Sequence, residues 1–345
     1  MGSKQVTIES SKSSNLPSVV ANLPIYEGCS GKAVSDLQRR LAVQGLSTHP
    51  DQEGTFGPGT RAGIEAFQHR RGLRIDGICG PQTWNTLVEA GFILGDRLLY
   101  LRMPMFRGDD VAVLQQRLSA LGFDTGRVDG IFGELTERAV KEFQRNAGLP
   151  IDAIAGGKTL TELLRLQAPY HQSELISMVK AREELRQAPN TLTGRHLVIG
   201  ENGGLGPAVA AIRRRLTSIG TRITELHHPD GSVQANRANI LKADLFVGLR
   251  LEPDSLGCAT SFYAGYDYES PGGKRLAELI QEFLPSRLGI SDLGYVGMSV
   301  PILRETRMPA VIVEVGPPTV IVEHANTLAE GLEMALKAWV SYIWD

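Results

Sequence analysis

The sequence predicts a multidomain chain, in which two small all-α three-helix repeats precede an α/β domain with a largely parallel sheet. Three observations lead to this fold class. The length of 345 residues exceeds what one ordinary core needs. Motifs in the first half recur at a constant offset, and the second half alternates short apolar runs with helical patterns. We expect a flexible N-terminal tail (1–23), repeat 1 (24–92), repeat 2 (100–167), a linker or helix (168–192) and an α/β domain (193–345).

The internal duplication is the clearest pattern in the first half. Val34 corresponds to Val111 at an offset of 77 (111 − 34), and Gly54 to Gly130 at 76 (130 − 54), because the first copy holds one extra residue. In each copy, apolar residues recur at helical spacing and glycines follow where helices would end. Each copy therefore predicts three helices joined by glycine-rich turns. The shared turn positions are Gly54, Phe56, Gly57 and Thr60 in the first copy and Asp129, Gly130, Phe132, Gly133 and Thr136 in the second.

These motifs resemble the peptidoglycan-binding repeat of cell-wall hydrolases. That repeat combines Leu-Gln, Asp-Gly-x-Phe-Gly-x-x-Thr, Phe-Gln and Asp-Gly-x-x-Gly-Pro-x-Thr, and residues 129–136 match the second element while residues 76–83 match the last. The second copy departs at its end, where Ala153 and Gly157 stand for the expected Gly and Pro. The resemblance implies muropeptide or peptidoglycan as a ligand. Most matched residues are turn glycines and core aliphatics, for which a structural role is the alternative interpretation.

The second half alternates strand and helix patterns from Arg195 onward. This alternation is typical of an α/β domain with helices covering a largely parallel sheet. A short helix that begins at Ser173, as a side-chain cap, and runs through Arg186 is expected ahead of it. The expected strands are 196–199, 222–226, 244–249, 261–263 and 311–315, and the expected helices are 207–219, 233–242, 273–284 and about 319–342.

Two of these strands resemble strands of the zinc-dependent N-acetylmuramoyl-L-alanine amidases. Residues 243–250, Ala-Asp-Leu-Phe-Val-Gly-Leu-Arg, resemble one, and residues 307–316, which contain Pro-Ala-Val-Ile-Val-Glu-Val-Gly, resemble the other. The resemblance covers roughly residues 193–345. It implies a zinc ion held by two histidines and a glutamate, with a second glutamate as the general base that activates water.

Most of those site residues are missing from this chain. Asn202 lies nearest the first histidine position, and the chain passes from Gly204 almost directly into a predicted helix where the ligand glutamate should follow. Arg250 stands at the second histidine position, and an arginine has no lone pair to give a metal. Glu314 alone remains, at the position of the catalytic glutamate. We expect no metal and no cofactor, a degenerate cleft with Asn202 and Arg250, and a vestigial Glu314 in a buried ion pair with Arg250.

The other histidines offer no substitute ligand set. His227 and His228 are adjacent at the end of a predicted strand, so their side chains would point to opposite faces of the sheet. His196 opens a strand and His324 is expected in the last helix, with no carboxylate at a matching spacing for either. We expect each of them in a loop or on the surface.

Composition and net charge limit the classes of partner and the cellular compartment that we expect for this chain. A formal net charge of −2 gives no electrostatic reason to expect nucleic acid, and no apolar stretch is long enough for a transmembrane segment. The first residues lack the apolar run of a signal peptide. Three cysteines without a Cys-x-x-Cys pair indicate free thiols in a reducing compartment. The expected location is cytoplasmic.

Three functions fit these observations. The first is a catalytically inactive amidase-like regulator or scaffold of peptidoglycan biosynthesis that acts through protein contacts. This combination of domains resembles the CwlM-type proteins of actinobacteria, which implies as partners the enolpyruvyl transferase MurA or the machinery that exports the lipid-linked precursor. The alternative is an active amidase that uses zinc to hydrolyse the muramoyl–L-alanine bond. The third is a module that only anchors the chain to the wall polymer.

Overall fold

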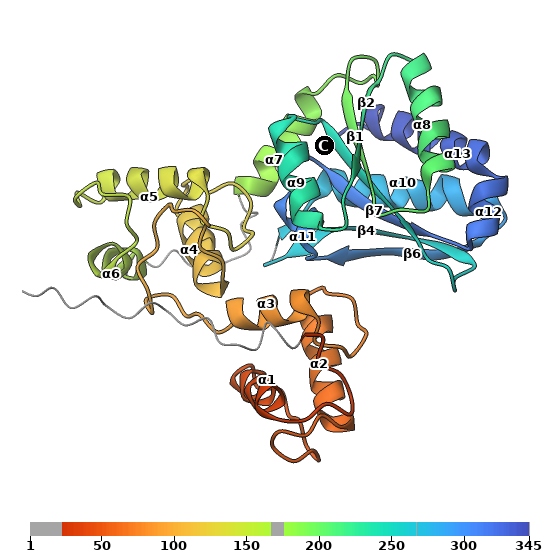
Figure 1. Ribbon diagram of the computed structural model, residues 1–345. Coiled ribbons are helices and arrows are strands. Elements are labelled where there is room, and N and C mark those ends of the chain that lie inside the picture. The colour runs from red at the N-terminus through yellow and green to blue at the C-terminus, as the bar shows by residue number, and fades with distance from the viewer. Residues whose placement is uncertain (1–22, 167–175, 267, 345) are drawn as a thin grey trace, which may run out of the picture.

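The computed structural model describes residues 23–166, 176–266 and 268–344. Figure 1 shows two small helical units followed by a larger domain built around a sheet, which confirms the predicted fold class. Most of the expected tail and the expected cap Ser173 lie outside the described residues. Repeat 1 contains α1 (Lys32–Val43), α2 (Pro58–Arg70) and α3 (Pro81–Glu89), and repeat 2 contains α4 (Asp109–Ala120), α5 (Glu134–Asn146) and α6 (Gly157–Arg165).

Each repeat is organised around its own apolar core. In repeat 1, Leu37 from α1, Phe67 from α2 and Leu87 from α3 belong to one buried cluster. Repeat 2 buries Leu114 and Phe143 in the corresponding way. The predicted helix ends are also present, since Gly45 after α1 and Gly122 after α4 have positive φ angles of 71° and 96°.

Each repeat contains two copies of a hydrogen-bonded unit that accounts for its recurring motifs. A buried glutamine on one helix reaches into the turn that leads to the next element. Gln144 donates from Nε2 to Asp152 Oδ1 (2.7 Å), Ile154 O (3.1 Å) and Thr159 Oγ1 (3.0 Å). Its Oε1 accepts from the backbone N–H of Asp152 and Ala153. The corresponding glutamines are Gln38, Gln68 and Gln115.

Ala153 interrupts this pattern with a strained backbone. Its φ of 64° lies in the left-handed region, where the corresponding residue of repeat 1, Gly77, has a φ of 68°. A Cβ in this region costs about 1–2 kcal/mol. A glycine avoids this cost, but its unfolded state has more conformational entropy, which offsets part of the gain. We expect Ala153→Gly to raise the free energy of unfolding by about 0.5–1 kcal/mol, measured by urea unfolding. The control Ala147→Gly, at an ordinary φ of −85°, should give no gain, and an equal gain from both variants would contradict the explanation.

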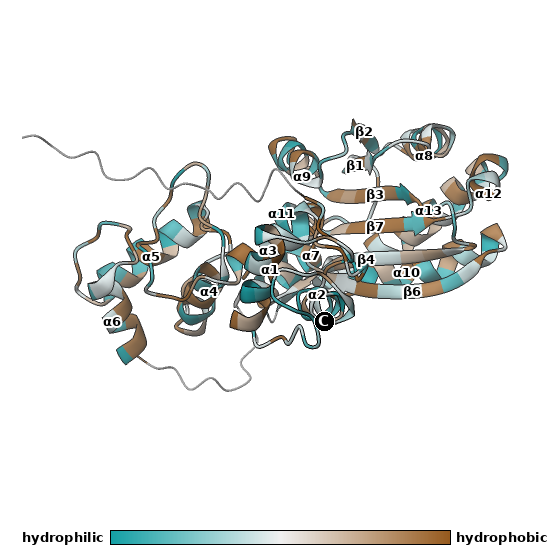
Figure 2. Cartoon of the chain, turned by 60° about the horizontal axis from the view of Figure 1, so that its bottom comes forward, coloured by the Kyte–Doolittle hydropathy of each residue, from teal (hydrophilic) through white to brown (hydrophobic). Residues whose placement is uncertain are grey.

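Among the described residues of the second half, seven strands form one sheet. Strands β2, β1, β3 and β7 are parallel neighbours in that order, while β4 runs antiparallel to β7 and to the short β5, and parallel to β6. In Figure 2 the central strands β3 and β7 are predominantly hydrophobic, as expected for strands covered on both faces. The strands are β1 (His196–Glu201), β2 (Arg222–His227), β3 (Leu245–Leu251), β4 (Gly257–Gly265), β5 (Tyr268–Glu269), β6 (Ser291–Met298) and β7 (Ala310–Val315).

Two apolar clusters lie on the two faces of this sheet. One joins alternate residues of β1, β3 and β7 to α8, α10 and α13. The other joins the opposite face to α9 and α11, and it also includes Ala112 and Val128 of repeat 2. The core of the second half is therefore continuous with repeat 2. The helices are α7 (Ile176–Gln187), α8 (Gly206–Ser218), α9 (Gly231–Ile240), α10 (Pro271–Leu288), α11 (Pro301–Glu305), α12 (Pro318–Glu323) and α13 (Ala325–Val340).

Several expectations about this domain need correction. The strand β6 and the helix α11 were not predicted, and the single helix expected near 319–342 is two helices, α12 and α13, that meet at His324. His196 is buried with 3% of its surface exposed, and not a surface residue, because β1 lies between β2 and β3. Its Nε2 lies 2.8 Å from Thr224 Oγ1. In the part of the chain that the structure describes, no helix is both long and apolar enough to span a bilayer.

The buried His196 predicts a loss of stability on the acid side. Burial lowers the pKa of His196 from its ordinary value of 6.5, and Arg222 lowers it further. The folded chain therefore favours the neutral ring, and the unfolded chain takes up the proton first. This contribution is complete above pH 6.5 and is lost as the pH falls through the folded-state pKa. His196→Gln should flatten the dependence of unfolding free energy on pH in this window; an unchanged dependence in urea titrations would contradict the assignment.

Candidate functional site

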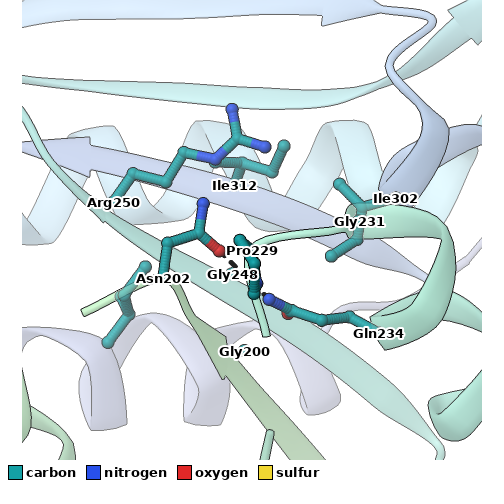
Figure 3. Close-up of a pocket in the computed structure, with 10 residues that line it drawn as sticks. Gly200, Asn202, Pro229, Gly231, Gln234, Gly248, Arg250, Ile302 and Ile312 are labelled. Atoms are coloured by element: carbon teal, nitrogen blue, oxygen red, sulfur yellow. Dashed lines mark hydrogen bonds between the residues drawn. The ribbon is translucent and has the colours of Figure 1, made fainter. Parts of the chain in front are cut away.

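The candidate site is a small cleft at the carboxyl ends of β1 and β3, covered by the start of α9 (Figure 3). In open α/β sheets, ligands bind at the carboxyl ends of the strands, at the point where the order of the strands reverses. Here β1 is that point, because β2 and β3 flank it on either side. The cleft brings Asn202 and Arg250 together. It is lined by Gly200, Asn202, Pro229, Gly231, Gln234, Gly248, Leu249, Arg250, Ile302 and Ile312.

Arg250 and Glu314 are direct neighbours on the parallel strands β3 and β7. Arg250 Nη1 lies 3.7 Å from Glu314 Oε1, so the expected ion pair is present. The two side chains are 34% and 25% exposed, which corrects the expectation of a buried pair. Water reaches both groups because they stand at the end of the sheet. A pair this exposed contributes about 0–1 kcal/mol, so the arrangement leaves the guanidinium largely available to the cleft.

Asn202 is held by a buried glutamine that the sequence did not single out. Gln234 is 2% exposed, and its Nε2 donates to Asn202 Oδ1 over 3.1 Å and to Glu201 O over 3.3 Å. Figure 3 shows the Gln234 side chain extending from α9 toward Asn202 and Gly200. Gly200 is required here, because a Cβ at this position would lie 2.1 Å from Gln234 Oε1. The amide oxygen of Asn202 is therefore engaged inside the protein.

A second polar pair lies at the end of β1 and was also missed. Glu201 and His227 are register partners on β1 and β2, and Glu201 Oε1 lies 3.1 Å from His227 Nδ1. Glu201 Oε2 accepts from the backbone N–H of Leu205, just before α8. The side chain of His227 is exposed, and His228 instead accepts a hydrogen bond from the backbone of Asp230. Counting from the start of each parallel strand would have found this pair.

The side chains in the cleft do not fit a zinc ion. Zinc in hydrolases is held by neutral histidine nitrogens and carboxylate oxygens. Arg250 is a cation without a free lone pair, and the carbonyl oxygen of Asn202 already accepts from Gln234. Glu314 faces Arg250 across the strands. Among residues 23–166, 176–266 and 268–344, no three His, Cys, Asp or Glu side chains gather in a way that could hold a metal ion.

Comparison with known proteins identifies both halves of the chain. A family of peptidoglycan binding domains matches residues 30–87 and 107–163, which lie in the two helical repeats. The N-acetylmuramoyl-L-alanine amidase CwlM of Mycobacterium tuberculosis is 33% identical over 359 residues, covering 88% of this chain and 86% of the relative. The chain belongs to the CwlM-type N-acetylmuramoyl-L-alanine amidase family. This CwlM-type chain is therefore a peptidoglycan-associated, amidase-like protein.

Two further similarities each cover a little under half of this chain. The N-acetylmuramoyl-L-alanine amidase CwlL of Bacillus licheniformis is 30% identical over 187 residues, covering 48% of this chain and 52% of the relative. The crystal structure of the amidase Ami1 from Mycobacterium smegmatis gives a TM-score of 0.37 at 13% identity, covering 44% of this chain and 98% of that chain.

Proposed function

We propose that this chain is an amidase-like protein of peptidoglycan metabolism that does not hydrolyse peptidoglycan. The observation that carries the proposal is Arg250 at the end of β3, where a zinc amidase needs a neutral ligand. A permanent cation repels a metal ion and supplies no lone pair. Without bound zinc, water at the site keeps its ordinary pKa, so no hydroxide forms at neutral pH. Glu314 alone cannot replace the metal.

Zinc retention tests this part of the proposal. The purified full-length chain is dialysed against zinc and then against metal-free buffer, and the metal retained per chain is measured. We expect no retained zinc. About one tightly held zinc per chain would contradict the proposal and favour the alternative, an active amidase. That alternative is supported by the names of the relatives.

The role that we propose is regulation or scaffolding through protein contacts. An amidase-like domain that does not hydrolyse its substrate can still bind other proteins, and the two repeats fused to it add further binding surface. We place the chain in the cytoplasm, where precursors are made. The proposed partners are the enolpyruvyl transferase MurA and the machinery that exports the lipid-linked precursor. Muropeptide or peptidoglycan is a further proposed ligand, bound by the two repeats.

A direct rate measurement tests the partner. Enolpyruvyl transfer by the purified transferase is followed with and without a stoichiometric excess of the chain, and complex formation is measured by size-exclusion chromatography. We expect a complex and a changed rate. A normal rate and separate elution at micromolar concentrations would contradict this partner and move the proposal to the export machinery.

A further inference from the structure

A buried arginine lies where all three folded units meet. Arg304 in α11 is 7% exposed, and its Nη1 donates to Glu89 Oε2 of repeat 1 over 2.7 Å. Its Nε donates to the backbone oxygen of Asp129 in repeat 2, also over 2.7 Å. Burial alone would lower the pKa of Arg304, but Glu89 raises it above its usual value. The guanidinium therefore stays charged, and removing it would leave Glu89 without its partner.

The amidase-like domain covers the central turn of repeat 2. A Cβ on Gly130 would lie 3.2 Å from both the ring atom Cε2 and the hydroxyl oxygen of Tyr266. Tyr263 Oη donates to Val128 O over 3.3 Å, and both residues belong to the same buried cluster. Arg127 donates to the backbone oxygens of residues 306 and 308. The turn that carries the signature Asp129-Gly130-Ile131-Phe132 is thus an interface inside the molecule.

The corresponding turn of repeat 1 faces solvent. Glu53 and Thr55 are exposed, whereas Ile131, which corresponds to Thr55, is 8% exposed. Repeat 1 reaches the larger domain with another part of its surface, because Gly72 O accepts from the backbone N–H of Ser299 over 2.8 Å. The residues agree with these positions, since the covered turn carries an isoleucine and the free turn a threonine.

The compared amides of the two turns have matching acceptors, although the Asp129 carboxylate accepts two further hydrogen bonds in repeat 2, from Gln115 Nε2 and from the N–H of Ile131. The N–H of Gly54 donates to Gln38 Oε1 over 2.8 Å, and that of Gly130 donates to Gln115 Oε1 over 2.9 Å. The next signature phenylalanine donates in both copies to the carbonyl of an earlier loop residue, Phe56 to residue 29 and Phe132 to residue 106. A difference between these amides that disappears when the interface is broken therefore reports on docking and not on the turn's own hydrogen bonds.

We propose that the two repeats have divided their roles. The central turn of repeat 2 is an intramolecular docking surface for the amidase-like domain, held in place by Arg304, whereas the central turn of repeat 1 stays open to solvent. The helix that carries Arg304, α11, also borders the cleft. In α11, Ile302 lines the cleft, and Glu305 pairs with Arg107 of repeat 2 over 2.7 Å and accepts from Ser232 of α9 over 3.0 Å. Release of repeat 2 is therefore expected to loosen one wall of the cleft.

Hydrogen exchange of single amides in the full-length chain tests this division. In the natural chain, we expect the amides of Gly130 and Phe132 to exchange at least about tenfold more slowly than those of Gly54 and Phe56. In Arg304→Gln this difference should disappear while α5 keeps its protection. The matched control Arg307→Gln changes an exposed neighbour and should leave the difference intact.

Two results would overturn the proposal. Equal exchange of the two turns in the natural chain would mean that repeat 2 does not stay docked in solution. Full protection of Gly130 in a folded Arg304→Gln chain would mean that Arg304 does not hold the interface. If Arg304→Gln fails to fold, the comparison of the two turns in the natural chain still decides the docking. Neither outcome depends on whether the chain hydrolyses peptidoglycan or binds a precursor enzyme.

Discussion

Replacing Gln68 with leucine is expected to lower the free energy of unfolding of repeat 1 by about 2–4 kcal/mol. Gln68 Nε2 donates to Asp76 Oδ1 (2.7 Å), Ile78 O (3.0 Å) and Thr83 Oγ1 (3.1 Å). Its Oε1 accepts from the backbone N–H groups of Asp76 and Gly77. Leucine has a similar size but leaves the buried N–H of Gly77 and the buried hydroxyl of Thr83 without these partners. Each buried unsatisfied group costs about 1–3 kcal/mol.

The matched control is Gln52→Leu in the same repeat. Gln52 is exposed, and its backbone oxygen, not its side chain, accepts from Gln38. The control should change the unfolding free energy by less than about 0.5 kcal/mol. Urea unfolding followed by the fluorescence of Trp84, which lies in the core of repeat 1, measures both variants. Similar losses from Gln52→Leu and Gln68→Leu would show that the hydrogen-bonded unit is not what stabilises the turn.

Replacing both Asn202 and Arg250 with histidine is expected to change the cleft from one that retains no zinc to one that holds about one zinc per chain. The double variant removes a fixed positive charge and supplies two neutral imidazoles. It also frees Glu314, which now pairs with Arg250 at 3.7 Å, to act as a carboxylate ligand. Metal content after dialysis measures the gain.

The control for this experiment adds the same number of histidines without completing the cleft. Asn202→His combined with Arg287→His places the second imidazole at an exposed position in α10, and it should retain no zinc. If the Asn202→His, Arg250→His variant were as free of zinc as the control, the missing donors would not be the reason for the loss of the metal site. The backbone of the cleft would then have changed as well.

The sequence predicted the parts of the fold that depend on local pattern. The duplicated glycine and glutamine motifs predicted two helical units because each motif closes a turn within its own repeat. The apolar strands β3 and β7 were also predicted, since they are buried on both faces. β6 was missed because it pairs only with β4, and its apolar residues are interrupted by Gly294 and Gly297 and are mostly exposed, so they follow no buried alternation.

The candidate site was predicted only in part. Arg250 and Glu314 could be placed opposite each other from two strand motifs. The positions of Gln234 and of the pair formed by Glu201 and His227 follow from how helices and strands are aligned with one another. No sequence motif marks that alignment. Arg304 depends on contacts between units, because Glu89 lies 215 positions away in the sequence. A buried arginine in a five-residue helix has no signature of its own.

The release of free amino termini from peptidoglycan, with zinc present in excess, decides whether this chain is a hydrolase. We expect no release above the rate without protein, because Arg250 stands at the end of β3 and Asn202 is engaged by Gln234. A zinc amidase of known activity, assayed on the same substrate, supplies the positive control. Release that depends on zinc and disappears in Glu314→Gln would contradict the account, and the chain would then be an active amidase with a metal site that its side chains do not reveal.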